Sequence, residues 1–384
     1  NATANYIAEL VGDNNVQIEG QNLVVCPGSV EEIQELTALA MTEGWTITPA
    51  GNRTWLPNNA GSTLVISTSR LNRIKEHEPA DLIAIAEAGV PLKRFNEELA
   101  QNGQWLPLDP PDNGRATLGG VVATGLGGAQ QFAYGRPRGS VIGMKVALGG
   151  GELIKAGGRV VKNVAGYDLC KLFTGSYGTL GIITEVTFKL RPKPTVEHTI
   201  LVNGTVEDLI KNGRAIIEMR LFPVGLELVS SAVAKELGVT VQSTHSTLLV
   251  RFAGNERGVK FQTDQALSKF GENCSEVIRN DVSLWETLAS LPLRNSTNRS
   301  WRVSVLPDRA YQLIETLSTI YKRGFNELQW QLGIADGRFR MMTDVQNILE
   351  AQATVEAIGG NFFIEDPTLA VRTTSSLMKR VKEQ

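Results

Sequence analysis

The first half of the chain alternates short apolar runs with segments of helical periodicity. Leu23–Val25 is an apolar run ended by Pro27-Gly28, which predicts a strand. Ser29 and Glu32 form a capping box, and apolar residues then recur at helical spacing, which predicts a helix over 30–40. The same reasoning predicts strands at 45–48, 64–67 and 82–86 and a helix from Pro91 to Leu99. This part of the chain therefore mixes α and β elements.

After Pro192-Lys193-Pro194 the pattern changes, because glycine becomes rarer and longer amphipathic segments begin. The prolines predict a domain boundary. Two successive series then have the order β-α-β-β-α-β, with elements at 198–202, 206–219, 225–229, 248–252, 256–270 and 275–278, and at 301–306, 310–321, 328–334, 338–342, 345–358 and 362–365. Two ferredoxin-like units of this kind, side by side, would form one antiparallel sheet with helices on one face.

Composition excludes several classes of protein. The chain has 384 residues, 20% of them charged, and a net charge of −2, so it lacks the excess of Lys and Arg that nucleic-acid binding requires. No apolar run approaches the ~20 residues that span a bilayer, and no charged-then-apolar leader follows Asn1. Cys26, Cys170 and Cys274 lie far apart and fit neither an iron–sulfur cluster nor a disulfide framework. We expect a cytoplasmic protein with reduced thiols, which reaches a membrane only through partners.

Glycine is concentrated in one stretch, since 18 of the 38 glycines lie between Asn113 and Gly181. Glycine lets backbone approach a ligand closely, and free N–H groups can gather around phosphate oxygens. The glycines fall in separate clusters, unlike the single tight turn of a Rossmann fingerprint. The pairs at 149–151 and 157–158 are interpreted as hairpin turns. The rest of the stretch predicts a nucleotide cradle.

Several motifs occur in a characteristic order along the first 195 residues. They are Pro27 to Ile33, Pro49 to Thr54, Glu87-Ala88-Gly89-Val90, Thr117-Leu118-Gly119-Gly120, Lys162-Asn163 with Gly166-Tyr167-Asp168-Leu169, and Gly175 to Gly181. Together they resemble the FAD-binding domain of the vanillyl-alcohol oxidase/p-cresol methylhydroxylase flavoproteins, and within that family the E subunits of glycolate oxidase, also called glycolate dehydrogenase. The resemblance is strong over residues 15 to 195 and weak beyond them.

The resemblance implies the fold class and the domains. It implies an α+β protein with a two-part PCMH-type FAD-binding domain at 1–195. An α+β ferredoxin-like cap domain with an antiparallel sheet would follow at 196–366, and a C-terminal helix at 367–384 would return to the FAD domain.

The resemblance also implies which residues contact FAD. One pyrophosphate loop would comprise Pro49, Ala50, Gly51, Asn52, Arg53 and Thr54, and a second would contribute Thr117, Leu118, Gly119, Gly120, Ala123, Thr124, Gly125 and Gly128. Tyr134, Gly135, Lys162 and Asn163 would lie near the flavin, and Gly178, Thr179, Gly181, Ile182 and Ile183 near the adenosine. The first loop has no histidine, so noncovalent FAD is expected.

The late cap hairpin, 333–340, departs from the relatives that oxidise 2-hydroxy acids. Those relatives carry a histidine-rich metal motif there, whereas this hairpin has Asp336, Arg338 and Arg340 but no histidine. The two arginines could bind a carboxylate in bidentate fashion, yet alternation on a hairpin favours a solvated face. His77, His198 and His245 are scattered, so each is interpreted as an incidental surface residue and no metal site is expected. Asp168 is interpreted as a helix N-cap.

Three functions remain open, and no catalytic residue is identified. The chain would be the FAD-bearing subunit of a glycolate dehydrogenase, acting on a small 2-hydroxy acid together with a sister FAD subunit and an iron–sulfur subunit. It would alternatively be a noncatalytic FAD-binding scaffold or electron-relay subunit. A free-standing flavin 2-hydroxy-acid dehydrogenase is the third possibility, and the missing cap histidines weigh against it.

Overall fold

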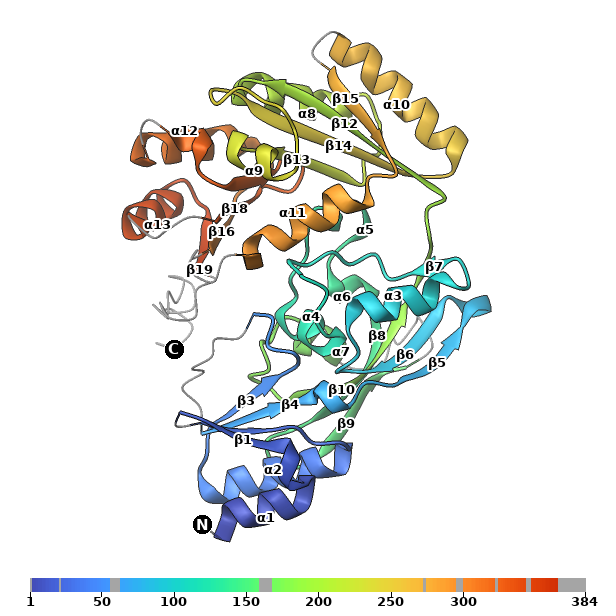
Figure 1. Cartoon of the computed structure of the whole chain (residues 1–384), viewed down its shortest axis with the longest axis vertical. Coiled ribbons are helices and arrows are strands. Elements are labelled where there is room, and N and C mark those ends of the chain that lie inside the picture. Colours follow the sequence, from blue (N-terminus) through green and yellow to red (C-terminus); the bar gives the residue numbers. More distant parts are fainter. Residues whose placement is uncertain are drawn as a thin grey trace. The chain divides into compact units, whose positions relative to one another are not determined.

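A computed structural model describes residues 2–20, 22–55, 63–158, 168–271, 274–294, 300–321, 324–342 and 347–364. The chain divides into two compact units, unit 1 at Asn1–Lys193 and unit 2 at Pro194–Gln384 (Figure 1). Both combine helices with antiparallel strands, so the predicted α+β fold class is confirmed. The C-terminal helix expected at 367–384 lies outside the described residues.

Unit 1 begins with a four-stranded sheet. Its order is β1 (Val16–Glu19), β2 (Asn22–Val25), β4 (Leu64–Ser67) and β3 (Ile47–Ala50), with β2, β4 and β3 parallel and β1 antiparallel to β2. Helices α1 (Ala2–Val11) and α2 (Val30–Glu43) pack against this sheet (Figure 1). The predicted cap of α2 is confirmed, because the Ser29 side chain accepts a hydrogen bond from the Glu32 amide. Ile33 and Leu36 on its inner face are fully buried.

A five-stranded antiparallel sheet completes unit 1. Its order is β5 (Ile74–Glu78), β6 (Ile83–Glu87), β10 (Ile182–Lys189), β8 (Val141–Ala147) and β9 (Leu153–Gly157). Apolar side chains from three helices share one core with the sheet: α3 (Leu92–Ala100), α4 (Leu118–Thr124) and α7 (Leu169–Phe173). Gly149–Gly151 forms the turn between β8 and β9, as predicted. The turn predicted at 157–158 is wrong, because Gly157 is the last residue of β9 and Gly158 donates to Ile142 on β8.

Unit 2 contains one eight-stranded antiparallel sheet. Its order is β15 (Cys274–Arg279), β12 (Val196–Gly204), β14 (Ser246–Gly254), β13 (Gly225–Val229), β17 (Trp330–Gly333), β18 (Arg338–Met342), β16 (Ser300–Ser304) and β19 (Asn361–Ile364). Each half has the ferredoxin-like connection that the sequence predicts, and the halves join where β13 pairs with β17. The structure adds two helices that the pattern did not predict, α9 (Ser231–Glu236) and α11 (Val282–Arg294).

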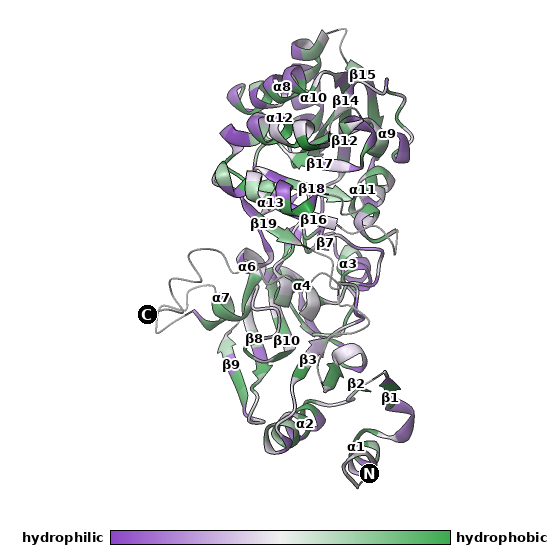
Figure 2. Cartoon of the chain, turned by 90° about the vertical axis from the view of Figure 1, so that its left-hand side faces the viewer, coloured by the Kyte–Doolittle hydropathy of each residue, from purple (hydrophilic) through white to green (hydrophobic). Residues whose placement is uncertain are grey.

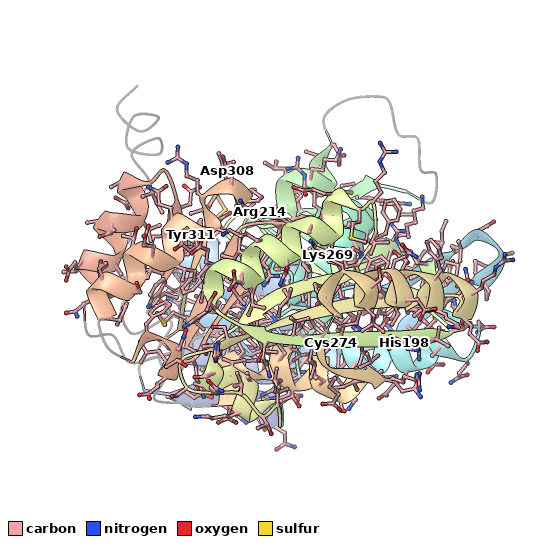
Figure 3. All side chains as sticks on the ribbon, turned by 90° about the horizontal axis from the view of Figure 1, so that it is seen from above. His198, Arg214, Lys269, Cys274, Asp308 and Tyr311 are labelled. Atoms are coloured by element: carbon pink, nitrogen blue, oxygen red, sulfur yellow. The ribbon has the colours of Figure 1, made fainter. Side chains whose placement is uncertain are left out.

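One face of this sheet is apolar and carries helices. The helices are α8 (Val206–Glu218), α10 (Glu256–Phe270), α12 (Ala310–Tyr321) and α13 (Ile348–Ala357). Their buried apolar residues share a core with alternate strand residues such as Ile200, Trp301 and Phe339. Figure 3 looks onto this helical layer, where Arg214 of α8 lies near Asp308 and donates to the Pro307 carbonyl at 2.8 Å. Figure 2 shows the same layers as green strands beneath helices of mixed colour.

Candidate FAD site

The loop that follows β3 in unit 1 is the first element of the predicted cradle. The structure corrects its beginning, because Pro49 and Ala50 belong to β3. Proline is tolerated there since β3 is an edge strand of its sheet. The remaining residues, Gly51 to Thr54, form a bend, and the amides of Asn52, Arg53 and Thr54 donate to no oxygen among the described residues. This bend therefore offers a run of available backbone donors.

Arg53 holds the bend in a conformation that few non-glycine residues adopt. Its φ is 58°, in the left-handed region, and its guanidinium forms an ion pair with Glu19 at 2.8 Å. The ion pair directs the side chain away from the bend, toward β1. Sequence reasoning missed Glu19, because no local pattern links residues 34 positions apart. A strained residue fixed by a side-chain partner is typical of a ligand-binding loop.

Thr54 supplies an unsatisfied hydroxyl in the same bend. Its Oγ1 is buried and has no hydrogen-bond partner within the described part of the chain. A buried hydroxyl without a partner is costly, so native structures usually place a ligand or water against it. The Thr54 hydroxyl is therefore a sign of a bound group beside the bend.

The second predicted loop is mostly a helix. Thr117 caps α4, its hydroxyl accepting from the Gly120 amide at 3.3 Å, and the helix ends at Gly125 with φ 63°. The amides of Leu118 and Gly119 already donate to the carbonyls of Val90 and Ala88, at 2.9 and 2.7 Å. These two amides therefore hold the start of α4 against the residues that follow β6.

Close glycine contacts bring the separate segments together. A Cβ on Gly51 would lie 2.0 Å from Thr117 Oγ1, and one on Gly178 would lie 2.8 Å from the Pro49 ring. Gly175, which precedes the 178–183 segment, donates its amide to Val122 on α4 at 3.0 Å. Helix α4 and the Thr117 that caps it thus contact both the bend at 51–54 and the 175–181 turn, and this turn also contacts Pro49 near the end of β3. Gly181 ends this turn, and Ile182 and Ile183 begin β10.

Tyr134 and Gly135 lie at the end of a short helix, α5 (Gln131–Tyr134), where Gly135 has φ 89°. The Tyr134 ring packs edge-on against Trp105, with 5.5 Å between the ring centroids. The Cζ atom of Arg191 lies over the Tyr134 ring, 5.5 Å from its centroid. Strand β7 (Gln104–Trp105) pairs with β11 (Arg191–Pro192), which fixes both neighbours.

The Tyr134 region also has unsatisfied polar atoms. Trp105 Nε1 and Gln130 Oε1 are buried without a partner among the described residues. The sequence analysis missed both residues, since neither belongs to a motif. The other two flavin-side candidates, Lys162 and Asn163, lie outside the described residues.

Asp168 has the role that the sequence assigned to it. Its carboxylate accepts from the Lys171 amide at 3.1 Å and caps α7. The hydrogen bond from Lys171 lowers the pKa of Asp168, against the opposing effect of partial burial. The predicted N-cap role of Asp168 is confirmed.

The arginines of the late hairpin are buried, so the expectation of a solvated face for Arg338 and Arg340 is wrong. Arg338 is 8% exposed and Arg340 is 2% exposed. Arg338 donates to Glu227 on β13 at 2.6 Å, a partner 111 positions away. Alternation failed as a guide because β18 lies inside an eight-stranded sheet, where the face opposite the helices is buried as well.

Metal ligands do not converge in the described part of the chain, where no group of three His, Cys, Asp or Glu side chains could hold an ion. All three histidines are partly buried rather than fully exposed, and His77 bonds to Gln104 at 2.9 Å. The three cysteines are free, as expected. No described helix is long and apolar enough to cross a membrane.

Part of unit 1 is similar to a known family of domains. Residues 22–157 match the family model of an FAD binding domain, which indicates that this part of the chain binds FAD. The donor set fits the cofactor, since the amides at 52–54 and the Thr54 hydroxyl have no partner among the described residues, and closely packed glycines suit a diphosphate.

Individual relatives sharpen this assignment. The chain is 42% identical over 165 residues to glycolate oxidase subunit GlcE of Escherichia coli, covering 43% of this chain and 46% of the relative. It is 33% identical over 279 residues to D-lactate dehydrogenase of Anaerostipes hadrus, covering 69% and 57%. The structure resembles alkyldihydroxyacetonephosphate synthase with a TM-score of 0.68 at 18% identity, over 88% of this chain and 72% of that one, which shows the fold. The chain spans about half the length of the curated relatives it matches.

Proposed function

We propose that this chain is an FAD-dependent oxidoreductase subunit that acts on a short 2-hydroxy acid such as glycolate. The observation that carries the proposal is the bend at 52–54, whose donors lie in the domain that matches the FAD binding family. Relatives named glycolate oxidase subunit and D-lactate dehydrogenase support the substrate class. The FAD is held without a covalent bond, because the bend contains Asn52, Arg53 and Thr54 but no histidine.

Bound FAD would accept the hydride equivalent that leaves the hydroxy acid. Within the described residues, the bend at 51–54 and the 175–181 turn would hold the cofactor. The ion pair with Glu19 would keep the Arg53 side chain away from the bound cofactor. The reaction also needs a base for the hydroxyl proton, which is worth typically ~10²–10⁴-fold in rate. The late hairpin has no histidine to act as that base, and its Arg338 is engaged by Glu227.

This deficit favours activity that depends on partners. The proposed assembly contains a sister FAD subunit and an iron–sulfur subunit. It would lie in the cytoplasm, or at the cytoplasmic face of the membrane if those partners attach it there. The relative named GlcE supports the E subunit as the counterpart of this chain. The alternative of a noncatalytic FAD-binding scaffold or relay subunit rests on the same missing base.

The Thr54 hydroxyl allows a test of the cofactor site that needs no turnover. Thr54→Val keeps the shape and removes the orphaned hydroxyl, so FAD affinity should fall roughly 2- to 10-fold, one hydrogen bond's worth. The apoprotein should resist urea as well as before or better, because no buried polar group is then left unpaired. Fluorescence titration with FAD and urea unfolding measure the two effects.

A matched control is Thr37→Val, a buried threonine on α2 whose hydroxyl already bonds to the Gln34 carbonyl. It should leave FAD affinity unchanged. Unaltered FAD binding by Thr54→Val would remove the bend from the cofactor site. Acid precipitation of the wild type should release all flavin into the supernatant, and yellow protein in the pellet would contradict noncovalent binding.

The partner-dependent proposal predicts slow turnover by the isolated chain. FAD-replete protein should reduce an electron-accepting dye with glycolate at least ~10²-fold more slowly than the assembled complex, as expected when base catalysis is missing. Steady-state dye reduction measures this. Equal rates would show that one chain holds a complete active site, and complete inactivity even in the complex would favour the scaffold alternative.

A further inference from the structure

Two polar side-chain atoms near α5 are buried without a hydrogen-bond partner in the described part of the chain. They are the indole Nε1 of Trp105, which can only donate, and the Oε1 of Gln130, which can only accept. We call them the unpaired donor and the unpaired acceptor. Gln130 as a whole is 7% exposed. Because burying such a group unpaired is costly, a ligand that completes this region must supply one acceptor and one donor.

Tyr134 and Asp109 connect the residues that carry these two atoms. The Tyr134 ring packs against Trp105, and the Tyr134 amide donates to the Gln130 carbonyl at 3.0 Å. Asp109 follows Trp105 by four residues, and its carboxylate accepts from the amides of Gln130 and Gly128 at 2.8 and 3.1 Å. Trp105 and Gln130 are thus close neighbours, and two separate sets of contacts hold them in place.

The segment 105–117, which carries the unpaired donor, leads directly to the bend that follows β3. The Pro111 carbonyl accepts from the Trp55 indole at 2.8 Å. The Arg115 carbonyl accepts from the Asn52 side chain at 2.9 Å, and the Arg115 guanidinium donates back to the Asn52 carbonyl at 3.2 Å. This segment therefore joins the proposed diphosphate site to the unpaired donor and acceptor within unit 1.

Both ends of FAD carry a heterocycle that offers a donor beside an acceptor. The pyrimidine ring of the flavin has its N3–H between two carbonyls, and adenine has an amino group beside a ring nitrogen. The flavin carbonyls gain negative charge when the ring accepts a hydride equivalent, whereas adenine does not change. The Cζ atom of Arg191 lies over the Tyr134 ring, so positive charge is present in this region. Since nearby charge and hydrogen bonds tune a redox cofactor, the flavin end fits better.

We propose that Trp105 and Gln130 bind the pyrimidine edge of the flavin, with the indole donating to a ring carbonyl and the Gln130 Oε1 accepting from N3–H. The inference rests on the proposed function and adds two residues to its cofactor site that no motif indicated. The bend holds the diphosphate, and this pair fixes the flavin end. Because the indole bond strengthens as the carbonyl gains charge, Trp105 also favours the reduced cofactor.

Removing each unpaired atom tests the proposal by equilibrium binding. Trp105→Phe keeps an aromatic ring against Tyr134, and Gln130→Leu keeps most of the side-chain volume. Each should weaken FAD binding roughly 2- to 10-fold, one hydrogen bond's worth. Neither should change the affinity for ADP, which has the diphosphate and the adenosine but no flavin. Fluorescence titration measures FAD binding and calorimetry measures ADP binding.

Two control variants remove groups that are already paired. Trp330→Phe in unit 2 loses a donor to the Phe325 carbonyl at 3.0 Å, and Gln34→Leu on α2 loses a donor to the Gly151 carbonyl at 2.7 Å. Both should lower the urea midpoint and leave FAD affinity unchanged. Gln130→Leu should show the opposite pattern, since its Oε1 has no described partner to lose in the apoprotein.

The reduction potential of the bound flavin gives a readout that a purely structural role of Trp105 would not move. Trp105→Phe should weaken the binding of reduced FAD roughly 3- to 10-fold more than that of oxidised FAD, because the lost bond is stronger in the reduced state. This ratio corresponds to a fall of about 15–30 mV for a two-electron couple. Reduction in the presence of reference dyes measures it. An unchanged potential would overturn the assignment of Trp105 to a flavin carbonyl.

The binding outcomes separate this inference from the proposed function. Equal losses of FAD and ADP affinity would overturn the inference in favour of adenine at these atoms. Unchanged FAD affinity in either variant, with weaker binding by Thr54→Val, would overturn the inference and leave the FAD site at the bend intact. A wild-type chain that binds no FAD would overturn the proposed function together with the inference.

Discussion

Units 1 and 2 each contain a charged cluster on a sheet, and the two clusters differ in how far their cations are removed from water. On the five-stranded sheet, Glu185 pairs with Lys75 and Lys145 at 2.7 and 3.0 Å, and the two lysines keep about a third of their side-chain surface exposed. In unit 2, Arg251 and Asp281 are 5% and 0% exposed. The first cluster can exchange its partners with water, whereas the second cannot. The cost of breaking each should therefore follow burial rather than the number of ion pairs.

The largest effect is expected at Asp281. Among the described residues, Asp281→Ala leaves the buried Arg251 with one carboxylate partner, Glu197 at 3.0 Å, and Thr199 loses its acceptor. Removing one partner of a buried pair costs about 3–5 kcal/mol of unfolding free energy, which urea denaturation measures. Asp264→Ala, which breaks an exposed pair with Lys260 on α10, is the control and should change less than ~0.5 kcal/mol. Similar losses for both would remove burial as the explanation.

A smaller effect is expected at Glu185, together with a pH signature. Burial alone would raise the pKa of Glu185, but hydrogen bonds from Lys75 and Lys145 outweigh it and lower that pKa below 4.5. The pKa of Glu87 is lowered in the same way by Arg73. A lowered folded-state pKa gives stability that is present above the unfolded pKa and is lost as the pH falls through the folded value.

Glu185→Gln should therefore cost about 1–2 kcal/mol at pH 7, as for loss of charge-assisted hydrogen bonds. The difference from wild type should shrink as the pH is lowered below ~4.5, the range in which the unfolded carboxylate takes up its proton. Urea midpoints across this range are the measurement. A difference that is constant with pH would show that the carboxylate charge does not matter.

The smallest effect is expected at Arg73, whose side chain is 75% exposed although it bonds to Glu87 at 2.8 Å. Arg73→Ala should lower the urea midpoint less than Glu185→Gln does, because an exposed guanidinium gains little from its ion pair and the Arg73 amide still donates to Glu87. Added salt should reduce even this difference. A loss as large as that of Asp281→Ala would break the proposed dependence on burial.

Periodicity predicted most elements, several of them to the residue. The strands Leu64–Ser67, Gly225–Val229 and Arg338–Met342 and the helix Glu256–Phe270 match the structure. These segments succeed because local pattern and tertiary environment agree. The Arg-Phe-Arg alternation of β18 was read as a half-solvated strand, and a second buried face is invisible to a period of two.

The candidate FAD site was predictable only in part. The resemblance identified the bend at 51–54, the Thr117 region and the 175–181 turn, whose contacts the structure describes. It did not indicate which amides are available, because the use of the Gly119 amide by Ala88 depends on tertiary packing. The ion pair of Arg53 with Glu19 and the unsatisfied Thr54 hydroxyl likewise became evident only from the three-dimensional structure.

Pairing β13 with β17 has a consequence for solubility. Two separate four-stranded sheets would expose four edges, whereas the joined sheet has two within the described ranges, β15 and β19. Unpaired edges are templates for aggregation, and the join pairs the apolar residues Leu228 of β13 and Leu332 of β17 directly opposite each other. The remaining edges are protected differently, since β19 has only four residues and β15 carries Glu276 and Arg279. If either half were expressed alone, β13 or β17 would become an unpaired edge strand that could pair with another molecule.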